Sequence, residues 1–180
     1  MRHNFEASQW LPYPIEPVFA FFADPRDLPR LLPQWQEARI EEASYTAPPT
    51  RPDKRINTLA AGAGSRMTIS FRPFPYSPFR VPWEAEISEF VWNDHFCDIQ
   101  LRGPFAYWRH CHRLKAETRA TQPGTLLRDE LEYELPFGAL GELAHSIAVR
   151  SQIKKIFAHR HQRTAELLAL CAPFIAASSR

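Results

Sequence analysis

Hydrophobic and polar residues alternate through the second half of the chain, and this period of two is typical of half-buried β-strands. The alternation divides into four strand-length segments, at residues 83–90, 95–102, 105–115 and 125–135. Only short breaks separate these segments, which predicts that they are antiparallel neighbours in one sheet.

The first part of the chain predicts one strand followed by two short helices. Residues 3–11 form the expected strand, and a short apolar helix follows around Phe19. Asp24 and Pro25 are typical of an N-cap followed by proline at the first helical position, and they begin a second short helix that Pro33 ends. Further strands are expected at residues 36–46, 55–62 and 65–72.

Residues 139–176 predict one long helix, because their apolar residues recur at helical intervals. At the rise per residue of an α-helix, such a helix is about 55 Å long and crosses a whole sheet. The run from Arg72 to Pro82 instead holds four prolines and three aromatic residues, which excludes a central strand. We expect an aromatic loop there, either at the mouth of a pocket or as a tightly packed cover.

Pairing the segments across their breaks predicts which side chains share a face of the sheet. A tight turn at residues 103–104 pairs Ile99 with Trp108, Cys97 with His110, and Asp98 with Arg109. The next break pairs His112 with Asp129, His110 with Leu131, and Arg109 with Glu132. The inward, apolar face then carries Cys97, Ile99, Leu101, Trp108, His110, His112, Asp129, Leu131 and Tyr133. The outward face is charged and holds an expected network of Asp98, Arg109 and Glu132.

Three polar residues are expected on the apolar inward face, namely His110, His112 and Asp129. Burying a carboxylate without a partner is costly, so Asp129 needs one. The predicted register places His112 directly opposite Asp129 and therefore predicts a His–Asp pair. The remaining histidines are expected at the surface: His3, His95, His145, His159 and His161.

The composition agrees with a single domain over residues 1–180 that ends in a short polar tail. The chain has 13 Phe and 5 Trp, which need a large core or a pocket to line. Its net charge of +2 is too small for a nucleic-acid interface. Basic residues on the C-terminal helix, among them Arg150 and Arg160, predict a solvated face.

The cysteines and the hydropathy of the chain indicate in which cellular compartment the protein is expected. Three cysteines without Cys-x-x-Cys spacing predict neither a disulfide framework nor a zinc site, which favours a reducing cytoplasm. The first residues lack the apolar segment of a signal peptide, and no apolar run approaches the roughly 18 residues of a spanning helix. We expect a cytoplasmic protein without a transmembrane segment, and a homodimer is one option for its assembly.

Several stretches of the chain resemble one known superfamily. They are residues 18–25, residues 96–112 with Gly-Pro-Phe and Trp-x-His-x-His, and residues 129–143 with Leu-Pro-Phe-Gly. On these residues the chain resembles the SRPBCC superfamily, and within it the bacterial ligand-binding proteins of polyketide cyclase/dehydrase-like type. The resemblance implies an α+β helix-grip (START-like) fold: a curved antiparallel sheet around a long C-terminal helix, with two short helices after the first strand. It also implies a cavity for a hydrophobic ligand and no particular reaction.

Together these observations favour a non-catalytic protein that binds or transports a hydrophobic small molecule of lipid, quinone, polyketide or aromatic type. No cofactor and no nucleic-acid partner are expected. The residues expected to contact the ligand are Trp83, Ile99, Trp108, His110, His112, Asp129, Leu131, Tyr133 and Phe157. A dry, packed core is the alternative for the same residues.

Three other functions stay open. A cyclase or dehydratase would use His112 as general acid or base, with Asp129 to orient it and His110 or Tyr133 to polarise a carbonyl. A metal could bind His110, His112 and Asp129 as a 2-His-1-carboxylate set, but a hydrogen-bonded pair explains the pattern equally well, and we assign no metal ligand. A protein-interaction module with a vestigial cavity would use the loop at residues 72–82.

Overall fold

A computed structural model of the chain describes residues 1–53 and 58–178. Its strands are all antiparallel and form a 7-stranded sheet in the order β1-β7-β6-β5-β4-β3-β2. Their bounds are β1 (Arg2–Leu11), β2 (Arg39–Ser44), β3 (Arg66–Phe71), β4 (Val81–Val91), β5 (His95–Arg102), β6 (Tyr107–Arg119) and β7 (Gln122–Glu134).

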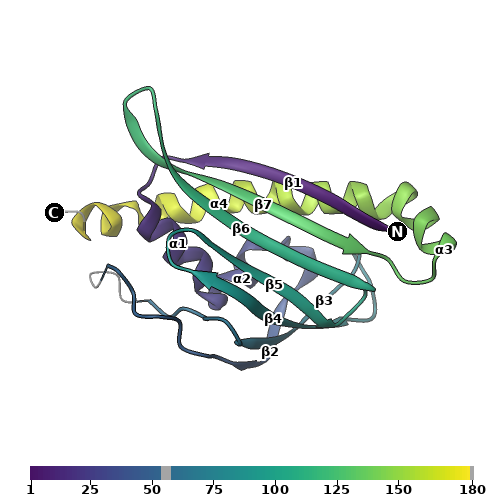
Figure 1. The fold of residues 1–180 in the computed structure, drawn as a ribbon. Helices are drawn as coiled ribbons and strands as arrows, with labels where there is room; N and C mark the ends of the chain where they lie inside the picture. Colours follow the sequence, from purple (N-terminus) through teal and green to yellow (C-terminus); the bar gives the residue numbers. More distant parts are fainter. Residues whose placement is uncertain (54–57, 179–180) are drawn as a thin grey trace.

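The helices fall into two groups along the chain. The first group follows β1 and comprises α1 (Ile15–Ala23), η1 (Pro25–Asp27), α2 (Leu28–Leu31) and η2 (Gln34–Gln36). The second follows β7 and comprises α3 (Ala139–Ala144), the π-helical turn η3 (His145–Val149) and α4 (Arg150–Ser178). Figure 1 shows α4 running along the length of the sheet, with α1 and α2 beside it. The long helix of the prediction is therefore interrupted by one π-helical turn.

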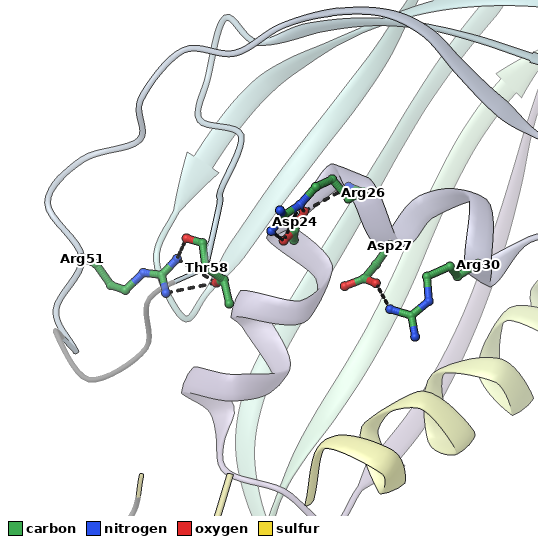
Figure 2. A network of polar contacts seen from close by, with 6 residues as sticks. All are labelled: Asp24, Arg26, Asp27, Arg30, Arg51 and Thr58. Carbon is green, nitrogen blue, oxygen red and sulfur yellow. Dashed lines mark hydrogen bonds and ion pairs between the residues drawn. The ribbon is translucent and has the colours of Figure 1, made fainter. Parts of the chain in front are cut away.

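The turn between α1 and α2 is fixed by the cap that the sequence predicted. Oδ1 of Asp24 accepts a hydrogen bond from the backbone N–H of Arg26 at 3.0 Å, and the carboxylate also pairs with the Arg26 guanidinium (Figure 2). Asp27 and Arg30 form a second pair one turn later (Figure 2). On the neighbouring loop Arg51 donates to the carbonyl oxygen of Thr58 at 3.1 Å. This N-cap positions the residues of α1 and α2 over the sheet.

Two groups of buried apolar side chains fill the space between the sheet and the helices. The larger is centred on α1 and includes Val18, Phe19, Leu127 and Leu168. The smaller joins β7 to α4 and consists of Leu131, Tyr133, Ile153 and Phe157. The two groups flank the region in which the predicted polar residues lie.

Most predicted strands are confirmed, but some bounds differ. Val81 and Pro82 belong to β4, so the aromatic loop covers only residues 72–80. Residues 58–62 form no strand, and residues 55–57 of that prediction lie outside the described part of the chain. β6 and β7 are longer than predicted because a two-residue turn joins them, with positive φ angles of 44° at Ala120 and 71° at Thr121. Positive φ angles at both turn residues give a two-residue hairpin the twist that matches its flanking strands.

The predicted register between β6 and β7 is confirmed, whereas the register between β5 and β6 is wrong by one residue. The structure pairs Cys97 with Cys111, Asp98 with His110, and Ile99 with Arg109. The reason is a wider loop: the Gln100 amide accepts from the backbone N–H of Phe105 at 3.3 Å and donates to its carbonyl oxygen at 2.7 Å. A shift of one residue turns every side chain of a strand to the opposite face.

The corrected register changes the faces of β5. Asp98 points inward, whereas Cys97, Ile99 and Leu101 do not, so Asp98 does not belong to the predicted outward network. Arg109 and Glu132 do face each other across β6 and β7, as predicted. The Arg109 guanidinium pairs with Glu89, with 2.7 Å between Nη2 and Oε1. Cys97 and Cys111 form a disulfide, which corrects the prediction of unpaired cysteines, and Cys171 is free and exposed. Within the described residues, no helix combines the length and apolar character that crossing a bilayer requires.

Candidate functional site

A cavity of about 400 Å³ lies between the sheet, the α1–α2 segment and α4. Its wall is mostly aromatic and aliphatic. Prominent lining residues are Phe21, Phe22, Phe71, Trp83, Phe96, Phe105, Trp108 and Phe157. The aromatic loop borders this space, since Pro73 lines it and the Pro73 carbonyl oxygen accepts from the Gln152 side chain of α4 at 2.8 Å.

The structure brings most of the predicted site residues together. Those that line the cavity are Trp83, Trp108, His110, His112 and Phe157. Leu131 and Tyr133 lie behind them, buried against Phe157 and Trp108. Ile99 is the exception: it pairs with Arg109 on the opposite face of the sheet, because the register of β5 differs from the predicted one.

The carboxylate of Asp129 lies at the centre of a buried polar group, which we call the Asp129 cluster: Asp129, His110, His112 and His161. Its Oδ1 atom lies 3.0 Å from Nε2 of His110 and 2.8 Å from Nδ1 of His112. Its Oδ2 atom lies 3.0 Å from Nε2 of His161. Burial alone would raise the pKa of Asp129, but the three imidazoles outweigh it and hold this pKa well below its ordinary value.

His110 lies between two carboxylates. Its Nε2 faces Asp129, and its Nδ1 lies 3.5 Å from Oδ1 of Asp98. Burial lowers the pKa of His110, but the hydrogen bonds to Asp129 and Asp98 raise it by more, so the net shift is upward. For Asp98, burial raises the pKa, and the hydrogen bond with His110 lowers it by more. The geometry therefore favours a protonated His110 between two ionised carboxylates.

His112 is held in the opposite protonation state. Burial, followed by the nearby charge of His110, lowers its pKa to about 4, so the ring is neutral at pH 7. Nη2 of Arg160 lies 3.4 Å from Nε2 of His112, and an arginine can only donate. Nδ1 of His112 then carries the proton toward Asp129, although the ring is not oriented for a hydrogen bond at that atom.

The sequence interpretation missed three residues of the site. Asp98 was placed outward by the wrong register, and Trp108 donates to it at 3.3 Å inside the cavity. Arg160 was assigned to a solvated face but lines the cavity. His161 was expected at the surface, yet it contacts Asp129. Its position four residues after the buried Phe157 was the signal for an inward-facing helical residue.

The other four histidines are also not fully exposed. His3 and His145 stack with 3.6 Å between their ring centroids, and the Tyr133 hydroxyl lies 2.9 Å from Nε2 of His145. Glu142 of α3 lies 3.1 Å from His3. This second group fastens α3 to the start of β1, outside the cavity. His95 and His159 are half-buried.

A family profile described as "Polyketide cyclase / dehydrase and lipid transport" matches residues 11–155 of the chain. A search with this chain found no matching curated protein. The family description fits a site that combines an apolar cavity with a few buried polar groups.

Solved structures share the helix-grip fold at low sequence identity. TTHA0849 from Thermus thermophilus is 20% identical, with a TM-score of 0.56 over 99% of this chain and 100% of that chain. Truncated norcoclaurine synthase from Thalictrum flavum is 10% identical, with a TM-score of 0.61 over 93% of this chain and 94% of that chain. Protein CV1439 from Chromobacterium violaceum is 14% identical, with a TM-score of 0.59 over 91% and 95%. At these identities the likeness establishes the fold alone.

Proposed function

Since the chain belongs to the polyketide cyclase / dehydrase and lipid transport family, we propose that it binds and carries a hydrophobic small molecule in the cavity beneath α4. The observation that carries this proposal is the cavity itself, at about 400 Å³ with a mainly aromatic wall. Small-molecule sites in proteins typically measure about 300–1,000 Å³ and combine apolar walls with a few placed polar groups.

The polar groups of the cavity indicate what the ligand carries at one end. Asp98, His112 and Arg160 line the same cavity and belong to β5, β6 and α4. Arg160 and protonated His110 are balanced by Asp98 and Asp129, which leaves no net charge among these four groups. A neutral oxygen, such as a carbonyl or hydroxyl, fits this balance better than a carboxylate or an ammonium group. The proposed ligand is therefore an apolar body with one neutral polar end.

A cavity-filling substitution tests the proposal. Ala85 of β4 lines the cavity, so Ala85→Phe is expected to reduce its volume and to weaken binding. Ala116 of β6 is exposed, and Ala116→Phe is the matched control. Native mass spectrometry of the purified proteins, mixed with neutral lipids, quinones and aromatic polyketides, would measure the bound mass. Equal binding by both variants would contradict the proposal.

The second candidate is catalysis of cyclase or dehydratase type, and the placement of His112 favours it. The ring of His112 lines the cavity, and its Nδ1 atom lies 2.8 Å from Oδ1 of Asp129, so a rotation of the ring would complete the arrangement of a general base with an orienting carboxylate. Under this reading, His112→Gln abolishes conversion of a bound polyketide while the bound mass persists. Unchanged product formation by His112→Gln in a chromatographic assay would exclude the role.

A further inference from the structure

We propose that His110, His112 and Asp129 form a binding site for a divalent transition-metal ion, Zn²⁺ or one of similar chemistry, that opens into the cavity. Two imidazole nitrogens and one carboxylate oxygen are a ligand set that such ions use. The site concerns groups at the end of the cavity and does not depend on which hydrophobic ligand the cavity takes.

The candidate ligand atoms converge on one point. One ring nitrogen each of His110 and His112 and one carboxylate oxygen of Asp129 all lie within 4.8 Å of one another, and all three residues are buried. The shorter separations are 3.0 Å and 2.8 Å, both to Oδ1 of Asp129. Ligand atoms around a tetrahedral zinc ion lie about 3.4 Å apart. Both nitrogen–oxygen separations therefore lie close to the spacing that such an ion imposes.

The orientation of His112 supports convergence rather than simple pairing. Its buried Nδ1 lies only 2.8 Å from Oδ1 of Asp129, yet it has no hydrogen-bond partner within the described residues. A lone pair directed at a shared metal ion points between the ligand atoms and not at any one of them. The close but misaligned contact is the geometry expected of two ligands of one ion.

The groups behind the ligands are those that metal sites use for support. Nδ1 of His110 faces Asp98 at 3.5 Å, which gives a carboxylate–histidine pair behind the metal-facing Nε2. His161 contacts the other oxygen of Asp129, Oδ2, at 3.0 Å. Such outer partners orient the ligands and strengthen binding. Asp98 and Asp129 together also supply the two negative charges that balance a divalent ion.

The site leaves a coordination position toward the cavity, because His110 and His112 both line it. A water molecule or an oxygen of the hydrophobic ligand can occupy that position. Binding at Nδ1 moves the proton of His112 to Nε2, which then no longer accepts from Arg160. Arg160 is therefore a competitor of the metal and not a supporting group.

Cobalt(II) provides a visible probe of the site. We expect the full chain, freed of metal by dialysis against a chelator, to bind a single equivalent of Co²⁺ with visible absorption bands that Zn²⁺ displaces. His110→Ala and Asp129→Asn are expected to abolish these bands. His161→Ala should weaken binding by about 10-fold, since it removes an outer partner. Arg160→Gln should bind Co²⁺ at least as tightly as the unchanged chain.

His145→Ala is the decisive control, because His3, Glu142 and His145 also gather near one another. We expect His145→Ala to keep the absorption bands. In this variant Co²⁺ should also broaden the indole NMR resonance of Trp108, whose ring centroid lies 6.4 Å from that of His110. This measurement requires no substitution of His110, His112 or Asp129. Absence of saturable Co²⁺ binding by the unchanged chain, or its loss in His145→Ala, would overturn the proposal.

Discussion

At the scale of single residues, the carboxylate of Asp129 determines the chemistry of the site. It is 2% exposed and lies against three imidazoles, so its negative charge is balanced by side chains and not by water. The same charge helps to protonate His110, whereas burial and then the charge of His110 lower the pKa of His112 and keep its ring neutral. The two neighbouring histidines of one strand thus differ in protonation because of their partners.

Asp129→Asn is expected to lower the free energy of unfolding by about 3 kcal/mol, because it leaves the buried His110 without one of its two counter-charges. Urea denaturation followed by circular dichroism measures the change. Glu130→Gln is the control from the next position: Glu130 pairs with Arg113 at 2.7 Å on the exposed face, so its loss should cost no more than about 1 kcal/mol. Equal losses in the two variants would contradict the role given to Asp129.

At the scale of elements, the β5–β6 pair depends on a disulfide as well as on its ladder. Cys97 and Cys111 are fully buried, lie directly opposite each other, and are joined across 14 residues of chain. A cross-link of this span stabilises the fold mainly by restricting the unfolded chain.

Replacing both cysteines by alanine is expected to lower the free energy of unfolding by about 2–3 kcal/mol. Cys171→Ala should leave it unchanged, because Cys171 is exposed and unpaired. Guanidinium denaturation measures both. Thiol titration of the denatured, unreduced protein should find a single reactive thiol, and three reactive thiols would show that the disulfide does not form.

The β1–β7 pair depends on a glycine. A Cβ atom at Gly124 would lie 2.5 Å from the Trp10 ring and 2.6 Å from the Leu11 carbonyl oxygen, and the backbone atom cannot easily move. Gly124→Ala should therefore cost about 1–3 kcal/mol of unfolding free energy. Gly103→Ala is the comparison, because its Cβ meets only the Gln100 side chain, which can move at the cost of its two hydrogen bonds to Phe105. Thermal unfolding ranks the two, and a larger loss at Gly103 would contradict this packing.

The strand registers could be predicted from the sequence only in part. The β6–β7 hairpin was predicted in register because its alternation is long and its turn short, so His112 and Asp129 were correctly placed opposite each other. The register of β5 was predicted wrongly, because the hydrophobic pattern does not encode the exact length of the loop between β5 and β6. The odd-numbered residues of β5 are the more apolar set, yet they face away from the cavity, with the disulfide among them.

Of the polar site residues, those on β6 and β7 could be predicted from the sequence, whereas those on α4 could not. Strand alternation places His110, His112 and Asp129 on one face, and this requires only local periodicity. Arg160 and His161 lie on α4, and their approach to the cluster depends on how the helix crosses the sheet. The helical spacing from Phe157 indicates only that His161 faces inward. Which strand residues it meets depends on packing between residues far apart in the chain.

At the scale of the whole molecule, sheet and helices enclose a cavity whose wall combines distant parts of the chain. Phe22 of α1, Trp83 of β4 and Phe157 of α4 all line it. Trp83 and Trp108 lie edge to face, with 4.6 Å between their ring centroids, so a ligand in the cavity changes the surroundings of both indoles. Trp10 and Trp92 donate instead to backbone carbonyl oxygens of Glu117 and Pro49.

The most direct measurement is therefore a titration of ¹⁵N-labelled protein with a hydrophobic ligand, followed through the indole N–H resonances. We expect saturable shifts of the Trp83 and Trp108 signals and constant positions for Trp10 and Trp92, with the shifts suppressed in Ala85→Phe. Shifts confined to Trp10 and Trp92, or no saturable shift with any lipid, quinone or aromatic polyketide, would contradict the claim that this cavity binds a hydrophobic molecule.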